Sequence, residues 1–384
     1  MFIVDVGFSC VKWMTEDTKG IYRTIYRTSK KDEGLLYKEK RYVVGERALL
    51  KTDPCYLRTI DELIDLYPLF TAFAAQKAQI DKSDILVIGL PFDYWKIETA
   101  KSARGMHSII EKLKDSLIAI KLEDTEYKFD DIVVLPQGVG CINAYLNDTT
   151  GIKGNILGID IGFNTIVYSL FSVDENDTLY GKTLYKKGIH DMAINLINPV
   201  LEKYTPGKYY SPVEINYIIE KRQIQKGFDL IDISTEIDSA AKEYIESIFS
   251  YIIGDLSENI GVITFDTIVI GGGGARAIKE LSPYKVNIKV LEEPEYANVR
   301  GFKSKAIEIK PPIKEIIKPE IMETPHSIQP QITNVQTPTE EVKEEVKNEG
   351  DKTIEIKEPE EISHTATTME REKHYKVKKK STEY

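Results

Sequence analysis

Cysteine is scarce in this chain of 384 residues, and its placement excludes several classes of site. Cys10, Cys55 and Cys141 lie far apart and form neither a CxxC pair nor a metal-binding spacing. An odd number of cysteines also does not build a disulfide framework. We therefore expect three reduced thiols with no structural or metal-binding role.

Long apolar runs and an excess of basic charge are missing as well. No run approaches the about 20 apolar residues that a membrane-spanning helix needs, and the first five residues lack the basic region of a signal peptide. The formal net charge of -10 disfavours a nucleic-acid-binding surface over the whole chain. With 42% hydrophobic and 29% charged residues, the composition predicts a soluble, cytoplasmic protein.

Large apolar residues disappear from the sequence near residue 310. The stretch 311–384 has no Leu, Phe or Trp, but it has seven of the sixteen prolines, sixteen acidic residues and twelve Lys or Arg. Such a segment cannot bury enough apolar surface to offset its ordering entropy, so we predict a disordered, charged tail. Two roles stay open for it. It is either a solvating tether, or a docking arm whose basic cluster at 376–380 binds an acidic partner or, weakly, DNA.

The first 310 residues alternate short apolar runs with amphipathic stretches. This alternation predicts an α/β protein with mixed sheets. Runs rich in Ile, Val and Leu predict buried strands at 2–6, 84–90, 131–135, 155–161 and 265–270. Amphipathic stretches predict helices at 58–78, 98–116, 188–203 and 236–255.

One short motif occurs twice in this region. Residues 4–9 read Val-Asp-Val-Gly-Phe-Ser, residues 159–164 read Ile-Asp-Ile-Gly-Phe-Asn, and a β-branched run follows each. Each copy predicts a strand, an Asp, a turn with Gly, and a second strand. Because the offset of 155 residues is about half of the predicted folded part, we interpret the two copies as the start of two duplicated halves.

The repeated Asp-x-Gly suits the binding of phosphate groups. Gly7 and Gly162 can adopt positive φ and let the backbone approach a ligand closely, so that the following amides grip a polyphosphate from both sides. Asp5 and Asp160 would hold a hydrated Mg²⁺, and Lys12 could reach the β- and γ-phosphates. Either motif alone could be an ordinary hairpin with turn-forming residues. Their pairing at equivalent positions favours the phosphate site.

A run of glycines ends the predicted strand at 265–270. Four consecutive glycines are costly in backbone entropy, and they would let an adenine and its ribose lie against bare backbone, before a helix that we expect from Arg276. The spacing is not GxGxxG, and no GxxxxGK[ST] occurs, which excludes dinucleotide and P-loop motifs. The glycines are Gly271, Gly272, Gly273 and Gly274.

A polar residue follows the predicted strand at 131–135. Gln137 comes directly after Pro136 and before an apolar stretch that reaches Leu146. A glutamine is a weak base, so it would orient an attacking water by hydrogen bonds rather than remove a proton. The alternative is a solvent-exposed turn residue.

In this order, these segments resemble the actin superfamily over residues 1–308. The resemblance is closest to the bacterial and archaeal actins of the plasmid-segregation (ParM) type. Segments 41–48, 85–91 and 295–302, the last reading Glu-Tyr-Ala-Asn-Val-Arg-Gly-Phe, carry this closer match. The matching parts are a first phosphate loop (3–13), a first connecting element (133–146), a second phosphate loop (157–169), an adenosine loop (268–275) and a second connecting helix.

The resemblance implies an actin-like fold, a duplicated fold of the ribonuclease H type with two lobes and a nucleotide cleft between them. Lobe I would span residues 1–150 and lobe II residues 151–310. The final helix, at about 294–308, would return to lobe I. The tail at 311–384 has no counterpart in the family core.

The resemblance also implies a set of site residues. Asp5, Asp160 and Gln137 are the expected catalytic residues, and the two acids associate with Mg²⁺ through water. Many ParM-like proteins have Glu in place of Gln137, whereas eukaryotic actin has Gln, which leaves the rate of hydrolysis open. The residues expected to contact the nucleotide are Gly7, Phe8, Ser9, Cys10 and Lys12, then Gly162, Phe163, Asn164 and Thr165, then Gly188, Glu220 and the four glycines at 271–274.

The function implied by the resemblance is slow ATP hydrolysis coupled to assembly. Such a protein binds Mg-ATP, forms dynamic homopolymer filaments, and segregates plasmids or other DNA, or positions other cargo, together with an adaptor or DNA-binding protein. Two alternatives on the same fold stay open, a small-molecule kinase and a non-polymerising ATPase, although the sequence has no motif for the catalytic base that a kinase needs. A membrane-bound actin is disfavoured because Phe2 already begins the first strand.

Overall fold

The computed structural model describes residues 1–309, except 31–32, 51–52, 262–263 and 278–286. The predicted tail at 311–384, with its basic cluster, lies outside the described residues. In the described part, no helix is long and apolar enough to cross a membrane.

The first sheet has six strands in the order β3-β2-β1-β8-β10-β9. β1 pairs antiparallel with β2 and parallel with β8, which in turn is parallel to β10. Every residue of β1 is buried, because Phe2 and Val4 pack on the side of helix α1 (Ile60–Ala78), while Ile3 packs on the other side against α9 (Ala297–Ile309). The strands are β1 (Phe2–Val6), β2 (Cys10–Met14), β3 (Lys19–Arg23), β8 (Lys82–Leu90), β9 (Ala119–Leu122) and β10 (Thr125–Pro136).

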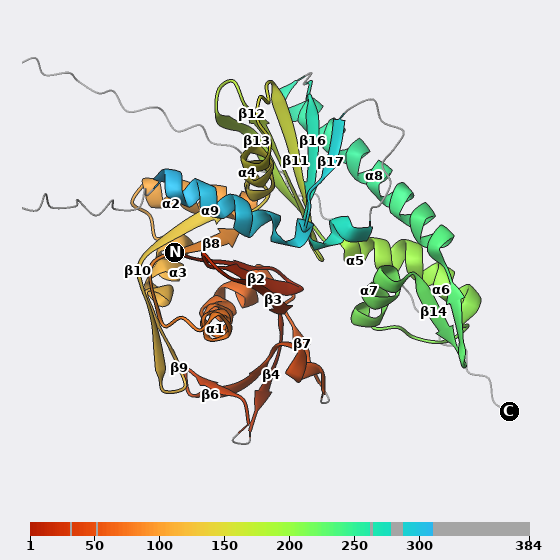
Figure 1. The fold of residues 1–384 in the computed structure, drawn as a ribbon, viewed down its shortest axis with the longest axis horizontal. Coiled ribbons are helices and arrows are strands. Elements are labelled where there is room, and N and C mark those ends of the chain that lie inside the picture. Colours follow the sequence, from red (N-terminus) through yellow and green to blue (C-terminus); the bar gives the residue numbers. More distant parts are fainter. Residues whose placement is uncertain (31–32, 51–52, 262–263, 278–286, 310–384) are drawn as a thin grey trace, which may run out of the picture. The chain divides into compact units, whose positions relative to one another are not determined.

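Helix α1 (Ile60–Ala78) lies between this sheet and a small four-stranded sheet (Figure 1). It begins at Thr59 with a capping box to Glu62, and its Tyr67 and Phe70 are fully buried in the shared core. The small sheet has the order β5-β6-β4-β7. Its strands are β4 (Ile25–Ser29), β5 (Leu35–Tyr37), β6 (Lys40–Val44) and β7 (Cys55–Tyr56).

The second large sheet has five strands in the order β13-β12-β11-β16-β17. α8 (Ser234–Ile260) packs on one face, and α4 (Val139–Asp148) packs on the other face (Figure 1). The strands are β11 (Asn155–Ile161), β12 (Thr165–Ser172), β13 (Asp177–Tyr185), β16 (Thr267–Gly271) and β17 (Asn287–Val290). The chain between β13 and α8 forms α5 (Ile189–Met192), α6 (Asn198–Tyr204), α7 (Pro212–Lys221) and the hairpin of β14 (Gln223–Lys226) with β15 (Asp229–Asp232).

The two large sheets begin with the same arrangement. In each, the first strand pairs antiparallel with the second and parallel with a later strand, β8 in the first sheet and β16 in the second. The turns also match, because the amide of Gly7 donates to the carbonyl of Cys10 at 3.0 Å and the amide of Gly162 donates to that of Thr165 at 2.9 Å. The repeated motif of the sequence therefore folds as the same hairpin twice.

Three predicted helices differ in detail from the structure. The stretch 98–116 contains two helices, the end of α2 (Phe92–Ala103) and α3 (Ile109–Leu117), because Gly105 adopts a φ of +67° and Ser108 caps a new helix. The stretch 188–203 is α5 and α6, joined by a π-helical turn at Ala193–Ile197. At the start of the helix predicted from Arg276 the structure describes a 3-10 turn at Gly273–Ala277, and the rest of that prediction, at 278–286, lies outside the described residues.

Helices α4 and α9 (Ala297–Ile309) meet at two glycines. A Cβ atom on Gly301 would lie 1.9 Å from the carbonyl oxygen of Gly140, and one on Gly140 would lie 2.6 Å from the Cα atom of Asn298. Both contacts are with backbone, so the two helices can approach this closely only without side chains at these positions. Since α9 also packs on the first sheet and α4 on the second, this crossing joins the two sheets.

The crossing makes a prediction about stability. Gly301→Ala should lower the free energy of unfolding by about 1–3 kcal/mol, because the added methyl group forces the helices apart. Gly254→Ala is the matched control, since a Cβ atom there meets nothing within 4 Å in α8. It should raise the free energy of unfolding by about 0.5–1 kcal/mol. Urea unfolding followed by circular dichroism measures both, and equal effects would contradict this account of the crossing.

Candidate functional site

The repeated hairpins bring two buried carboxylates and one ammonium group together. Asp5 on β1 pairs in register with Lys12 on β2, whose Nζ lies 3.7 Å from Asp5 Oδ2. Asp160 has the equivalent position on β11, beside Gly271 of β16. Burial disfavours the charge of Lys12, but the carboxylates of Asp5 and Asp160 outweigh it and raise the pKa of the ammonium group.

The negative charge of Asp5 affects the pKa of Asp160. Burial and then the negative charge of Asp5 raise its pKa to about 6, while Lys12 and a hydrogen bond from Asn298 act in the opposite direction. Two buried carboxylates therefore share a single ammonium group. In the described residues no group of three or more His, Cys, Asp or Glu side chains could hold a metal.

Gln137 lies beside this pair rather than on the surface. Its side-chain Nε2 donates to Asp5 Oδ1 at 2.6 Å, and its backbone amide donates to the carbonyl of Leu90 at 2.8 Å. The side chain is buried. The alternative of a solvent-exposed turn residue is therefore wrong, and Gln137 is held against the carboxylate with which it was grouped from the sequence.

Asn298 of α9 is a site residue that sequence reasoning missed. Its Nδ2 donates to Asp160 Oδ2 at 2.9 Å, and its Oδ1 accepts from the amide of Gly138 at 3.2 Å. Gly138 is the N-cap of α4 and directly follows Gln137. The signal in the sequence was a lone Asn among the apolar residues of 295–302, but only its position against Asp160 gives it a role.

The glycines in the turns of the two repeated hairpins do not have the backbone conformation that we expected from the sequence. Neither Gly7 nor Gly162 has positive φ, so that expectation is wrong. A Cβ atom on Gly7 would lie 3.2 Å from the carbonyl oxygen of Cys10, and one on Gly162 would lie 3.0 Å from that of Thr165, so both turns are tight at these positions. Positive φ occurs instead at Gly272, at +84°, where a Cβ atom would lie 2.2 Å from Asp160 Oδ1.

The second loop is also tied to helix α5. The amides of Ile189 and His190 donate to the carbonyls of Gly162 and Phe163, at 3.0 and 2.9 Å. Gly188 is the N-cap of α5, and a Cβ atom on it would lie 2.4 Å from the carbonyl of Phe163. The structure thus brings Gly188 to the second loop, which also contains Asn164 and Thr165.

The remaining predicted residues fall into two groups. Phe8 and Ser9 lie in the turn between β1 and β2, and Cys10 is the first residue of β2. Glu220 is exposed near the end of α7, a helix that contacts the 3-10 turn at Gly273–Ala277. The helix is therefore beside the glycine run.

No family model matches the chain, and no curated protein matches it. Solved structures do match. A ParM filament from Clostridium botulinum, described as 15-stranded, has 20% identity and a TM-score of 0.62 over 80% of this chain and 99% of that chain. An archaeal actin homologue, Ta0583, has 16% identity and a TM-score of 0.63 over 80% and 100%. Bacillus thuringiensis ParM with ATP has 14% identity and a TM-score of 0.55 over 80% and 98%.

The chain has an actin-like fold. This likeness confirms the actin-like α/β fold that the paired hairpins predicted. The matched part is 80% of the chain, and it covers almost all of each of these structures. At these identities the likeness is one of fold, and the chemistry of the site depends on the residues of this chain.

The raised pKa of Asp160 makes the stability of the actin-like chain depend on pH. A carboxyl whose pKa rises on folding, here from 3.8 to about 6, stabilises the folded state below pH 4, and this stabilisation is lost as the pH rises through 6. Asp160→Asn carries no charge at any pH. Above pH 6, with a chelator present, the free energy of unfolding of Asp160→Asn should therefore be about 2–3 kcal/mol higher than that of the unsubstituted chain.

The advantage of Asp160→Asn should shrink as the pH falls from 6 to 5. Urea unfolding at several pH values between 5 and 8 measures it, with the exposed Asp115→Asn on α3 as the control. A difference that stays constant over this range would contradict the assigned repulsion between the two carboxylates.

Proposed function

We propose that this actin-like chain binds Mg-ATP at its paired hairpins and hydrolyses it slowly. The observation that carries the proposal is the buried pair Asp5 and Asp160, which occupy equivalent positions of two repeated hairpins and are partly balanced by Lys12. Such a pair is unfavourable by itself, and a hydrated divalent cation with its phosphates would relieve it.

Each element of the site has a part in this proposal. The turn amides of the two hairpins and Lys12 would bind phosphate oxygens. Asp5 and Asp160 would hold Mg²⁺ through its waters, and the ion would neutralise charge on the phosphates. Gln137 would orient the attacking water, while its hydrogen bond keeps the carboxylate of Asp5 in place. Asn298 would orient Asp160.

The glycine run is the proposed place of the adenosine. The run begins at Gly271, the last residue of β16. The backbone amide of Gly272 donates to the carbonyl of Pro294 at 2.7 Å. Gly273 has open space where a side chain would be. Related structures are described as a complex of Ta0583 with ADP and as Bacillus thuringiensis ParM with ATP, which supports a nucleotide here.

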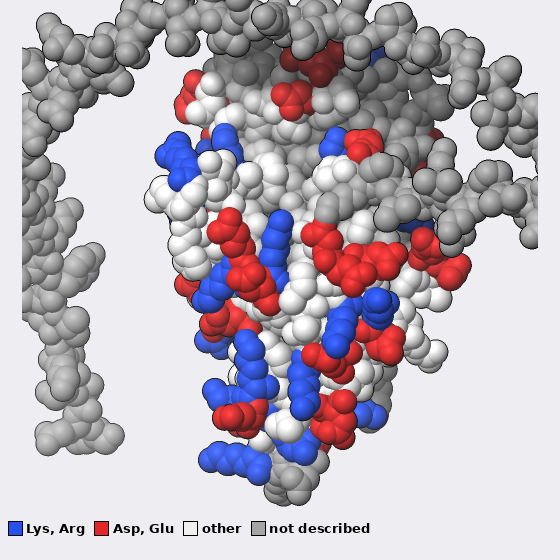
Figure 2. Space-filling model, turned by 90° about the vertical axis from the view of Figure 1, so that its left-hand side faces the viewer, with Lys and Arg blue, Asp and Glu red and all other residues white. Residues whose placement is uncertain are grey.

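We infer further that the chain assembles into homopolymer filaments in the cytoplasm, with a role in segregating DNA or positioning other cargo. The fold shared with a ParM filament supports self-assembly. Lys and Arg alternate with Asp and Glu on the face shown in Figure 2, which gives no basic footprint for DNA on that face. An adaptor would then connect the filament to its cargo.

Two lobes would frame the nucleotide. Lobe I, residues 1–150, contains the first large sheet, and lobe II, residues 151–310, contains the second. The final helix, α9, packs on the first sheet, which supports its assignment to lobe I. Its crossing with α4 would be the connection about which the lobes adjust to the nucleotide.

A direct test measures Mg-dependent ATP binding and phosphate release. Asp160→Ala should abolish hydrolysis and leave the fold intact, because the carboxylate is held by polar contacts and contributes little apolar packing. The exposed Asp115→Ala is the control. Undiminished turnover of Asp160→Ala would refute the assignment of the site. Turnover with GTP but not with ATP would show that the nucleotide is GTP.

Gln137 allows a finer test. Gln137→Ala should slow hydrolysis by roughly 10²-fold or less, as expected for the loss of one positioning side chain, and should leave ATP affinity nearly unchanged. Filaments of this variant should persist longer after ATP is added. A single-turnover assay beside an equilibrium titration with a fluorescent ATP analogue separates the two quantities. An unchanged rate would reduce Gln137 to a structural partner of Asp5.

A further inference from the structure

The β14–β15 hairpin presents an aromatic side chain to solvent. Its base is anchored, because Ile224 is buried and Ile231 packs against the core of the second sheet. Its tip turns at Gly227, with a φ of +65°, and the next residue, Phe228, is 105% exposed. Leu230 is also largely exposed. Phe is normally among the more buried residues, so an anchored hairpin that exposes one fits an interaction surface.

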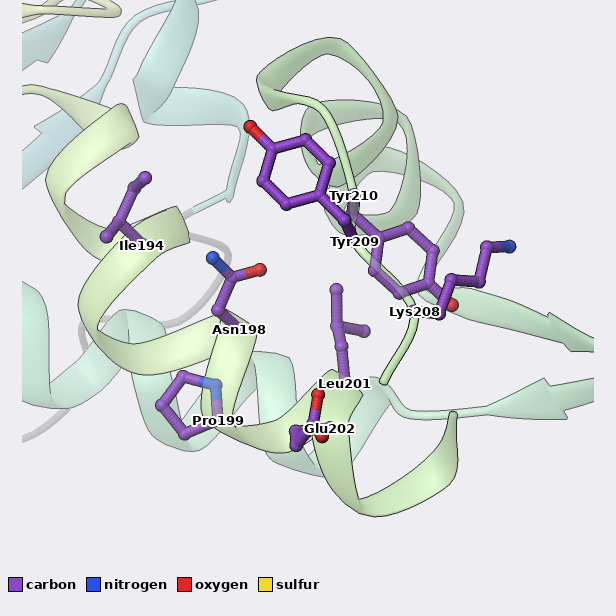
Figure 3. A pocket seen from close by; sticks show the side chains of 8 residues that line it. All are labelled: Ile194, Asn198, Pro199, Leu201, Glu202, Lys208, Tyr209 and Tyr210. Atoms are coloured by element: carbon purple, nitrogen blue, oxygen red, sulfur yellow. The ribbon is translucent and has the colours of Figure 1, made fainter. Parts of the chain in front are cut away.

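The same chain also has a pocket, which is concave where the hairpin tip projects. Its volume is about 330 Å³, and it lies between the helical run at 189–204 and the loop that precedes α7 (Figure 3). Leu201 and Ile194 contribute its apolar wall, and the ring of Tyr209, 85% exposed, extends over it. Tyr210 is buried, with Lys208 Nζ 4.5 Å from its ring centroid. The pocket therefore combines apolar and aromatic side chains with the polar side chains of Asn198, Glu202 and Lys208.

The charges around the two features are complementary. On the hairpin, exposed Lys226 and Asp229 flank the Gly227-Phe228 tip. At the pocket, exposed Glu202 and Lys208 line the opening. A docked hairpin tip could therefore set Asp229 against Lys208 and Lys226 against Glu202. Complementary pairs at the edge of a contact select the partner more than they strengthen it.

We propose that the hairpin tip of one copy docks into this pocket of a second copy, with Phe228 as the anchor. Phe228 is fully exposed in its own chain, so it does not fill its own pocket. A projection and a complementary pocket at different places on one chain make a contact that can repeat from copy to copy. An aromatic anchor in a preformed pocket is typical of the residues that dominate binding energy. This inference rests on the proposed self-assembly.

The anchor is tested by sedimentation of the full chain with Mg-ATP. Phe228→Ser should raise the critical concentration for assembly about thirtyfold, the equivalent of about 2 kcal/mol, and Tyr209→Ala should raise it as well. Ile97→Ser on α2, which removes a side chain that is 54% exposed, is the matched control and should leave the critical concentration unchanged. All three variants should bind ATP like the unsubstituted chain.

The charges allow a complementation test that only a contact between copies satisfies. Asp229→Lys and Lys208→Glu should each assemble poorly, because like charges then meet at every contact. An equimolar mixture of the two variants should assemble again, since each hairpin then meets a pocket of opposite charge in the other variant. The double variant should also recover. Recovery should weaken at high salt, as expected for exposed pairs.

Each failure has a distinct meaning. If Phe228→Ser assembles at an unchanged critical concentration, or if the mixture does not recover, the hairpin contact is refuted while self-assembly stands. If the unsubstituted chain hydrolyses ATP but stays monomeric at its highest soluble concentration, the contact is refuted while the nucleotide site stands. If the unsubstituted chain does not bind ATP, the proposed nucleotide site is refuted. The comparison of the variants with the unsubstituted chain by sedimentation would still decide whether the hairpin contact exists.

Discussion

The arrangement of this chain depends on placing two buried carboxylates within reach of one ammonium group. Burial and mutual repulsion both oppose the charged forms, and the pKa of Asp160, about 6, reflects this cost. Lys12 and the side-chain amides of Gln137 and Asn298 offset part of it. What remains is a site with an excess of negative charge, which suits a hydrated divalent cation better than an anion alone.

The close crossing of α4 and α9 makes this arrangement possible. With no side chains at Gly140 and Gly301, the two backbones touch, and Asn298 reaches both Asp160 and the amide at the start of α4. A bulkier crossing would move α9 away from the second sheet and break these hydrogen bonds. The helix crossing and the polar site are therefore one structural unit, although their residues come from four separate parts of the chain.

A second connection runs from the site toward the hairpin pocket. The carbonyls of the second hairpin loop accept from the first amides of α5, and the helical run continues through the π-helical turn into α6. Ile194 and Leu201 of that same run line the pocket. The loop and the pocket are therefore joined by one continuous run of helical backbone.

The sequence by itself determined the paired hairpins and the strands around them, because alternating burial and a Gly-containing turn are local properties. The actin-like fold followed from the resemblance of these segments, in their order, to a known family. Tertiary structure decided the rest. The hydrogen bonds of Gln137 to Asp5 and of Asn298 to Asp160 join residues 132 and 138 positions apart, and only packing sets such distances. Packing also decided how closely Gly7 approaches the carbonyl of Cys10, since what a Cβ atom would meet depends on its neighbours in space.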